Sequence, residues 1–291
     1  MYVYVNGEIV PHEEARLSAF DHGFLYGIGL FETFRTYGGH PFLLDDHLER
    51  LNCGLSGLRI DRQFGRAEAV DIIERLLRAN GLHDAYVRFN VSAGIGGLGL
   101  SVERYLRPTV IVYMKPLPPS APREGKEGIV LTTRRNSPEG DERLKSHHYL
   151  NNIIGKWELG NRPHAEGIFL NHEGAVAEGI VSNIFWVKDG VVYTPALSVG
   201  ILNGITRQFV IALLEQLHIP VEEGVYPLSH LQEADEVFIT NSLQEVVPLH
   251  RIGHRVYLGK NGPVTCVLQH HYRYFTDTLW TRNELAERMN R

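Results

Sequence analysis

The chain has 291 residues, 43% of them hydrophobic and 22% charged, a composition typical of a globular protein rather than of a disordered or membrane-embedded one. A formal charge of −5 gives no electrostatic reason to expect nucleic acid as a partner. The sequence offers two cysteines far apart, no apolar run of about 18 residues and no secretion signal at its start, so we expect a cytoplasmic protein with no membrane partner and no disulfide framework.

A proline-rich stretch marks the predicted domain boundary. Residues 118–128 contain several prolines and glycines and should form a stiff linker. A chain of this length can bury two ordinary hydrophobic cores. We therefore predict a small N-terminal α/β domain over residues 1–117 and a larger C-terminal α/β domain over residues 129–291, which together make an α/β (α+β) protein.

The first elements predict a sheet. Asn6-Gly7 is a strong signal for a two-residue hairpin turn within residues 2–10. Residues 20–29 are predicted to form a glycine-punctuated loop, residues 30–37 a strand, and residues 41–44 its continuation. Alternation along a strand places Phe31, Thr33 and Arg35 on one face.

Two helices are predicted next. Asp45 or Asp46 could cap a helix that starts at His47, and His47 and Arg50 would share a face because they are three residues apart. Apolar residues at helical spacing predict a second helix over residues 66–80, ending at Gly81.

A glycine-rich loop follows, between strands predicted at 85–91 and 109–114. Residues 94–99 match the pattern G-x-G-x-x-G of dinucleotide-binding proteins. That motif must open a helix and find an acidic residue about 20 positions later. Here Pro108 and a β-branched run follow instead, and Lys115 stands near the place of the acid, so we reject a dinucleotide site.

The C-terminal half alternates strands and helices. We predict strands at 129–133 and 237–242, helices at 149–159, 208–217 and 263–279, and hairpin turns at 171–174 and 188–190. The hairpins would place Glu178 and Asn183 on a small antiparallel sheet. Neither pair of adjacent histidines has a Cys or carboxylate at ligand spacing, so no metal site is expected.

Two residues indicate the chemistry. Lys145 stands near Arg143, His147 and His148, whose positive charge could lower its pKa and make it a nucleophile toward a carbonyl. Glu178 could keep a pyridine nitrogen protonated. Pyridoxal 5'-phosphate requires both groups. The competing interpretation is that both are ordinary solvated charges.

Anion binding is a second, separate indication. Leu202-Asn-Gly-Ile-Thr-Arg207 leads into a helix, and free N–H groups at a helix start can bind a phosphate. The strand that ends at Ser242 could supply a further hydroxyl. The sequence alone favours the simpler interpretation, in which Thr206 is only a capping residue.

Nearly the whole chain resembles the fold-type IV pyridoxal-phosphate enzymes, the class IV aminotransferase family. The most specific segments are Glu178-Gly-Ile-Val-Ser-Asn-Ile-Phe185, Thr194-Pro195 and residues 202–207. The resemblance implies a two-domain fold like that of D-amino-acid aminotransferase, with the cofactor at the domain interface, in a homodimer whose partner loops complete each site. It implies Lys145 as the residue that bonds the cofactor and transfers the proton. The implied cofactor contacts are Arg50, Tyr149, Glu178, Asn183, Leu202, Ile205, Thr206 and Ser242.

Within this family the chain looks most similar to 4-amino-4-deoxychorismate lyase, which makes 4-aminobenzoate and pyruvate for folate synthesis. Thr33 stands where the lyase has a proton-donating threonine and where the aminotransferases have glycine or an aliphatic residue. The glycine-rich loop is also lyase-like, although Leu98 replaces an arginine usual there. Phe31, Leu98 and Arg35 or Arg107 are therefore the candidate substrate contacts.

Two alternatives stay open. One is an aminotransferase for D- or branched-chain amino acids. The other is a binding or scaffold protein that kept the fold without the cofactor.

Overall fold

The computed structural model describes residues 1–117 and 125–289, which form two compact units. The first unit holds the described residues up to 117 together with Leu144–His148 and Thr276–Thr281. The second holds residues 125–143, Tyr149–Phe275 and the residues from Arg282 onward. Residues 118–124 of the predicted linker lie outside the described residues, whereas residues 126–128 belong to a strand of the second unit.

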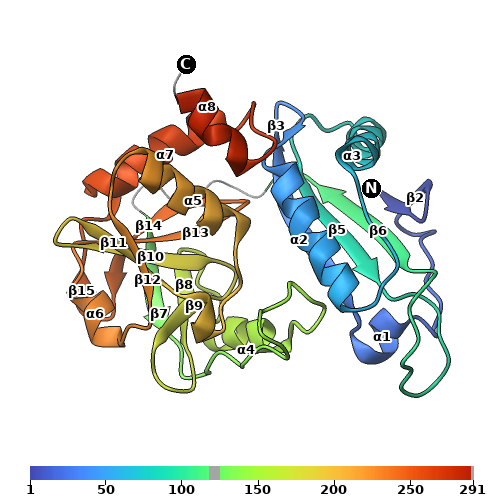
Figure 1. Cartoon of the computed structure of the whole chain (residues 1–291), viewed down its shortest axis with the longest axis horizontal. Coiled ribbons are helices and arrows are strands. Elements are labelled where there is room, and N and C mark those ends of the chain that lie inside the picture. The colour runs from blue at the N-terminus through green and yellow to red at the C-terminus, as the bar shows by residue number, and fades with distance from the viewer. Residues whose placement is uncertain (118–124, 290–291) are drawn as a thin grey trace. The chain divides into compact units, whose positions relative to one another are not determined.

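The first unit is built on a six-stranded antiparallel sheet in the order β2-β1-β6-β5-β3-β4 (Figure 1). Its strands are β1 (Tyr2–Val5), β2 (Glu8–Pro11), β3 (Gly29–Tyr37), β4 (His40–Pro41), β5 (Tyr86–Ser92) and β6 (Thr109–Lys115). The predicted hairpin turn is confirmed, since Asn6 and Gly7 join β1 to β2 with φ angles of 48° and 108°. The predicted strands at 30–37, 85–91 and 109–114 are also confirmed.

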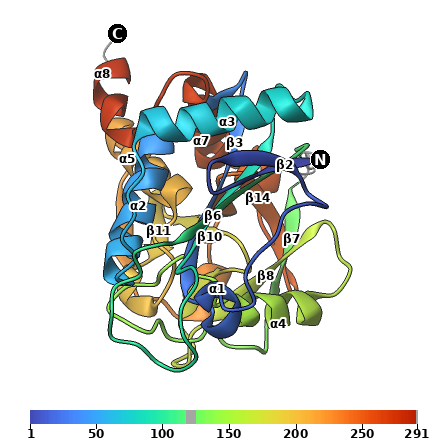
Figure 2. The same ribbon diagram turned by 90° about the vertical axis from the view of Figure 1, so that its right-hand side faces the viewer.

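Two helices pack on this sheet and bury its core. They are α2 (Leu44–Gly57) and α3 (Arg66–Asn80), and α3 lies beside β1 and β2 (Figure 2). Their apolar stripes cover the central strands, as amphipathic helices do. The residues of this core include Leu48, Leu51, Leu55, Ile72, Ile73, Leu76, Val87, Phe89 and Val112. The predicted end of α3 is confirmed, because Gly81 adopts a φ of 63° there.

Three predictions for this unit were wrong in detail. Residues 20–29 contain a short helix, α1 (His22–Tyr26), which Asp21 caps by accepting a hydrogen bond from Gly23 N. The strand predicted at 41–44 is only the two-residue β4. The cap of α2 is Leu43 rather than an aspartate, and backbone carbonyl groups take the place of a side-chain cap: Leu279 O accepts from Leu43 N and Trp280 O accepts from Asp45 N.

The second unit is built on a nine-stranded mixed sheet in the order β12-β11-β10-β13-β14-β7-β8-β9, with β15 paired to β14 (Figure 1). Its strands are β7 (Lys126–Val130), β8 (Ala165–Leu170), β9 (Val176–Gly179), β10 (Asn183–Lys188), β11 (Val191–Pro195), β12 (Val221–Gly224), β13 (Glu236–Asn241), β14 (Glu245–Ile252) and β15 (Arg255–Val256). Both predicted hairpins are confirmed. The small antiparallel sheet expected for Glu178 and Asn183 was wrong, since β9 and β10 belong to this large sheet.

Its helices are α4 (Leu150–Leu159), α5 (Ile205–Gln216), α6 (Leu228–Gln232), α7 (Pro263–Phe275) and α8 (Leu285–Met289), with 3-10 turns at Leu197–Val199, Gly259–Asn261 and Arg282–Glu284. α5 begins three residues earlier than predicted, so Ile205 and Thr206 form its first turn. α7 ends four residues earlier than predicted, at Phe275. Across the described residues, no helix combines the length and the apolar character needed to cross a membrane.

Candidate active site

Lys145 is positioned by strand β3 of the first unit. Phe31 N donates a hydrogen bond to Lys145 O at 3.0 Å, and His147 N donates one to Gly29 O at 2.9 Å. These bonds hold the segment Leu144–His148 along β3. They place Lys145 Nζ at 4.7 Å from the centroid of the Phe31 ring.

Thr33 and Arg88 belong to the same part of the sheet. Thr33 is two residues from Phe31, so the two side chains share a face of β3, as predicted. Arg88 is the partner of Thr33 on β5, and its Cζ lies 3.6 Å from the Phe31 ring centroid. The sequence analysis did not select Arg88. The sequence feature that could have indicated it is a cation within an otherwise mostly apolar strand. Only the strand register shows that Arg88 is the cross-strand neighbour of Thr33.

The His147 ring fills the space beside Gly29. A Cβ at position 29 would lie 2.3 Å from His147 Cε1, so the backbone here must be glycine. Burial, reinforced by the charge of Arg88, lowers the pKa of His147 to about 4. His147 is therefore neutral near pH 7, and its Nε2 is buried without a hydrogen-bond partner among the described residues.

Arg50 takes part in a buried network of the same unit. Its Nε and Nη2 donate to Glu32 Oε1 and Oε2 at 2.8 and 2.6 Å. His47 Nδ1 lies 2.7 Å from Glu32 Oε2. The predicted shared face of His47 and Arg50 on α2 is thus turned toward Glu32 of β3, which the sequence analysis did not select.

Glu178 lies in the second unit between two guanidinium groups. Its Oε1 accepts a hydrogen bond from Arg135 Nε at 2.7 Å and lies 3.8 Å from Arg143 Nε. Its Oε2 accepts one from Leu202 N at 3.0 Å. Burial, together with the charge of Arg135, lowers the pKa of Arg143 to about 10, which leaves it cationic near pH 7.

Asn183 connects this acid to the start of α5. Its Nδ2 donates to Leu202 O at 2.9 Å, while Leu202 N is bonded to Glu178. A Cβ at Gly204 would lie 2.0 Å from Asn183 Oδ1. The close approach of the chain at this point therefore requires glycine.

The start of α5 offers groups that suit a phosphate. Gly204 caps the helix, Ile205 and Thr206 form its first turn, and Thr206 Oγ1 lies 3.2 Å from Ser242 Oγ. Free N–H groups and the helix dipole favour an anion at such a terminus. Tyr149 caps α4 in the same unit. A buried carboxylate that is hydrogen-bonded to Leu202 N, just ahead of this helix start, fits pyridoxal 5'-phosphate, which has a basic ring nitrogen and a phosphate.

The remaining predicted substrate contacts also belong to the first unit. Arg35 stacks on Tyr37, with its Cζ 4.2 Å from the ring centroid. Leu98 is 76% exposed and Arg107 is also exposed, both on the segment that joins β5 to β6. Phe31 contacts Lys145 and shares a face of β3 with Thr33, and the substrate roles of all the predicted residues stay predictions.

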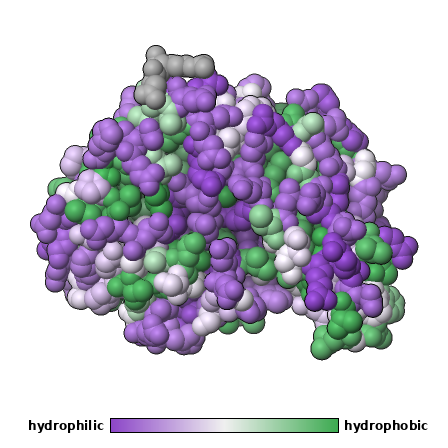
Figure 3. Space-filling view, in the orientation of Figure 1, coloured by the Kyte–Doolittle hydropathy of each residue, from purple (hydrophilic) through white to green (hydrophobic). Residues whose placement is uncertain are grey.

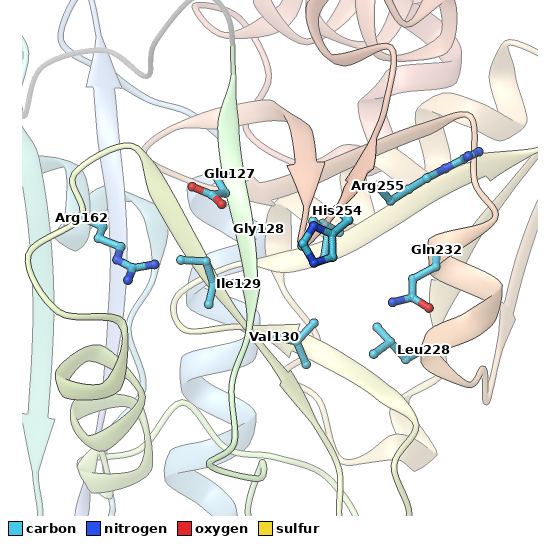
Figure 4. A pocket seen from close by; sticks show the side chains of 11 residues that line it. Glu127, Gly128, Ile129, Val130, Arg162, Leu228, Gln232, His254 and Arg255 are labelled. Carbon is cyan, nitrogen blue, oxygen red and sulfur yellow. The ribbon is translucent and has the colours of Figure 1, made fainter.

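A cavity of about 770 Å³ lies in the second unit along β7, α6 and the turn from β14 to β15 (Figure 4). Its walls include Ile129, Leu228 and His254. None of the predicted site residues lines it, so this cavity plays no part in the proposed chemistry.

The chain belongs to the amino-transferase class IV family, whose model matches residues 29–252. It is 48% identical over 273 residues to an aminodeoxychorismate lyase of Bacillus subtilis (strain 168), covering 93% of each chain. The structure matches 4-amino-4-deoxychorismate lyase from Pseudomonas aeruginosa with a TM-score of 0.84 at 29% identity, covering 94% of this chain and 99% of that one. It also matches the T.th. branched-chain amino acid aminotransferase in complex with N-(5'-phosphopyridoxyl)-L-glutamate, with a TM-score of 0.82 at 32% identity, covering 95% and 94%.

These similarities confirm the predicted family and the predicted fold class. The family of enzymes with this mixed α/β architecture includes both lyases and aminotransferases, as the relatives' names show. The roles of individual residues remain predictions.

Proposed function

We propose that the chain is a pyridoxal-phosphate-dependent lyase that converts 4-amino-4-deoxychorismate into 4-aminobenzoate and pyruvate, a step toward folate. The observation that carries the proposal is the 48% identity to the Bacillus subtilis aminodeoxychorismate lyase across 93% of the chain. The sheet register supports it, because Thr33 shares a face of β3 with Phe31, whose ring packs against Lys145 Nζ.

Pyridoxal 5'-phosphate would be held by Glu178 and by residues at the start of α5 in the second unit, together with Arg50. The cofactor supplies an aldehyde for the amine and a ring that accepts electrons when its nitrogen is protonated. Glu178 would face that nitrogen, and its contacts with Arg135 and Leu202 N keep the carboxylate in place. Thr206, Ser242 and Arg50 would bind the phosphate, and Tyr149 would lie near the ring oxygen.

Lys145 and Thr33 would move the protons. The Lys145 amine takes the proton from the ring carbon that bears the substrate's amino group. The Thr33 hydroxyl gives a proton to the methylene of the departing enolpyruvyl group. Lys145 then returns its proton to Thr33. The net result moves one proton from ring carbon to pyruvate methyl, so the reaction balances without an outside acid. Proton transfer by positioned groups contributes roughly 10²–10⁴-fold to a rate.

Arg88 would bind a carboxylate of the substrate. Its side chain lies on the Thr33 and Phe31 side of the sheet, and Arg88 Nε is held by Asn90 Oδ1 at 3.1 Å. A guanidinium binds a carboxylate with two parallel hydrogen bonds. Arg88 can thus supply the cation that Leu98 does not.

An aminotransferase of the same family is the second candidate. Its support is the match to the branched-chain amino acid aminotransferase structure at 32% identity. Lys145 and Glu178 would serve either reaction, because both begin with the same amine and ring chemistry.

We further propose a cytoplasmic homodimer in which loops of the partner complete each site. Apolar side chains gather on the exposed surface of α1 and of the segment from β5 to β6, where Phe24 is 77%, Leu100 95% and Val102 80% exposed. Figure 3 shows green surface over α1, at the lower right. Patches of this kind commonly mark protein interfaces. Sedimentation at several protein concentrations would test the dimer, and a monomer at all of them would contradict it.

A direct assay distinguishes the two candidate activities. Purified protein loaded with pyridoxal 5'-phosphate is incubated with 4-amino-4-deoxychorismate, and 4-aminobenzoate and pyruvate are measured. The proposal predicts equal amounts of both products. Turnover of an amino acid with 2-oxoglutarate, together with no 4-aminobenzoate, would instead establish the aminotransferase.

A further inference from the structure

Glu32 and His47 are the deeply buried members of the Arg50 network. Its side chain is 2% exposed, that of His47 is 1% exposed and that of Arg50 is 18% exposed. Both carboxylate oxygens meet the guanidinium, Oε1 at Nε and Oε2 at Nη2. Such a two-point contact fixes the plane of a guanidinium as well as its place.

The protonation states of this network are set by burial and by charge. Burial opposes ionisation of Glu32, but the charge of Arg50 and the hydrogen bond from His47 outweigh it and hold the pKa of Glu32 at about 2. Burial also lowers the pKa of His47, although Glu32 opposes that shift. Near pH 7 a neutral His47 therefore donates its Nδ1 hydrogen to an ionised Glu32, and Glu32 accepts from both partners.

We propose that Glu32 is a positioning residue that holds the Arg50 guanidinium in the orientation in which it binds the cofactor phosphate. The inference rests on the proposed phosphate role of Arg50. A guanidinium that meets a carboxylate through Nε and Nη2 presents Nη1 on its other edge. Glu32 thereby determines which edge of Arg50 faces the ligand.

Two effects of Glu32 on phosphate binding have opposite signs. As a negative charge, Glu32 repels the phosphate, so its removal alone would tighten binding. As an orienting group, it fixes Arg50, so its removal would weaken binding. The orienting effect should dominate, because the amide of Glu32→Gln would turn N–H donors toward the donors of Arg50 or His47 and displace the guanidinium.

The test is to titrate cofactor-free protein with pyridoxal 5'-phosphate and, separately, with pyridoxal, which lacks the phosphate. We expect Glu32→Gln to raise the Kd of pyridoxal 5'-phosphate at least tenfold and that of pyridoxal less than twofold. Glu32→Asp keeps the charge but is too short to hold both guanidinium nitrogens, so it should weaken pyridoxal 5'-phosphate in the same selective way. Unchanged or tighter binding in both variants would overturn the proposal.

A matched control is Glu236→Gln, which alters a carboxylate that is 2% exposed and accepts hydrogen bonds from Val264 N, Thr265 N and Thr265 Oγ1. Glu236→Gln should leave both Kd values unchanged, while its loss of thermal stability should be comparable to that of Glu32→Gln. In an Arg50→Met background, Glu32→Gln should have no further effect on pyridoxal 5'-phosphate, and an undiminished effect there would overturn the proposal.

The outcome for Arg50 separates this inference from the proposed function. If Arg50→Met leaves pyridoxal 5'-phosphate binding intact, the phosphate role of Arg50 fails. If Arg50→Met weakens it but neither Glu32 variant does, only the positioning role of Glu32 fails.

Discussion

Arg135 Nε donates a hydrogen bond to Glu178 Oε1 at 2.7 Å, and the side chains of the pair are only 7% and 6% exposed. Burying either charge alone would cost free energy of desolvation, and the attraction between the two charges offsets that cost. The arginine therefore does more than neutralise the acid. With Leu202 N on the other oxygen, it fixes the direction in which the carboxylate faces.

Arg135→Gln should lower the free energy of unfolding by about 3–5 kcal/mol, since it leaves Glu178 buried without its closest cation. Urea denaturation would measure the change. Arg251→Gln is the control, because that arginine is 48% exposed in its pair with Glu127, and such exposed pairs contribute about 0–1 kcal/mol. Equal losses in the two variants would contradict the importance given to the buried pair.

Thr33→Val should reduce formation of 4-aminobenzoate by about 10²–10⁴-fold, because it removes the proposed proton donor and keeps the side-chain shape. Turnover numbers with saturating substrate would show the loss, while cofactor absorbance should stay the same. Thr132→Val, which removes a hydroxyl bonded to Glu158 in the second unit, should leave the rate unchanged. An active Thr33→Val enzyme would rule out the role proposed for Thr33.

Gly204→Ala should weaken binding of pyridoxal 5'-phosphate, because its Cβ would lie 2.0 Å from Asn183 Oδ1 and force the start of α5 to move. A loss of at least tenfold in affinity is expected in a titration of cofactor-free protein. Gly57→Ala provides the comparison, since a Cβ there meets no atom within 4 Å, and its affinity should equal that of the unaltered chain. Normal affinity in Gly204→Ala would show that the cradle tolerates the displacement.

The stability of the chain should fall as the pH falls from about 6.5 to 4, in part through His147. Its pKa drops from 6.5 in the unfolded chain to about 4 in the folded one, so only the unfolded chain binds a proton in this window. The contribution of His147 to the free energy of unfolding is about 3 kcal/mol. It is fully present above pH 6.5 and is lost as the pH falls toward 4. His147→Phe should flatten this part of the pH dependence of unfolding, whereas parallel curves for the two proteins would exclude the contribution.

Much of the fold could be predicted because its signals are local. Asn6-Gly7 defines a hairpin by backbone preference alone, and Gly81 ends α3 because glycine readily adopts a positive φ. The capping of α2 could not be predicted. The carbonyl groups that take the place of a capping side chain, Leu279 O and Trp280 O, lie more than 200 residues away in sequence. α1 was missed because five residues are too few to show a helical period.

The candidate site shows the same division. Lys145 and Glu178 could be selected because their residue types and their neighbours carry the chemistry, whereas Thr33 was selected through the family resemblance. Arg135 and Glu32 could not be selected, because only the fold brings each one near its partner. Arg135 contacts Glu178, 43 positions away, and Glu32 contacts Arg50, 18 positions away. The register that sets Arg88 opposite Thr33 is likewise fixed by strand pairing rather than by local sequence.

The covalent bond between Lys145 and the cofactor is the claim on which the rest depends. Protein loaded with pyridoxal 5'-phosphate can be reduced with borohydride, digested and analysed by mass spectrometry. We predict one phosphopyridoxyl group, on the peptide that contains Lys145, and none in Lys145→Ala. A label on another lysine, or no label on a protein that has bound the cofactor, would contradict the account.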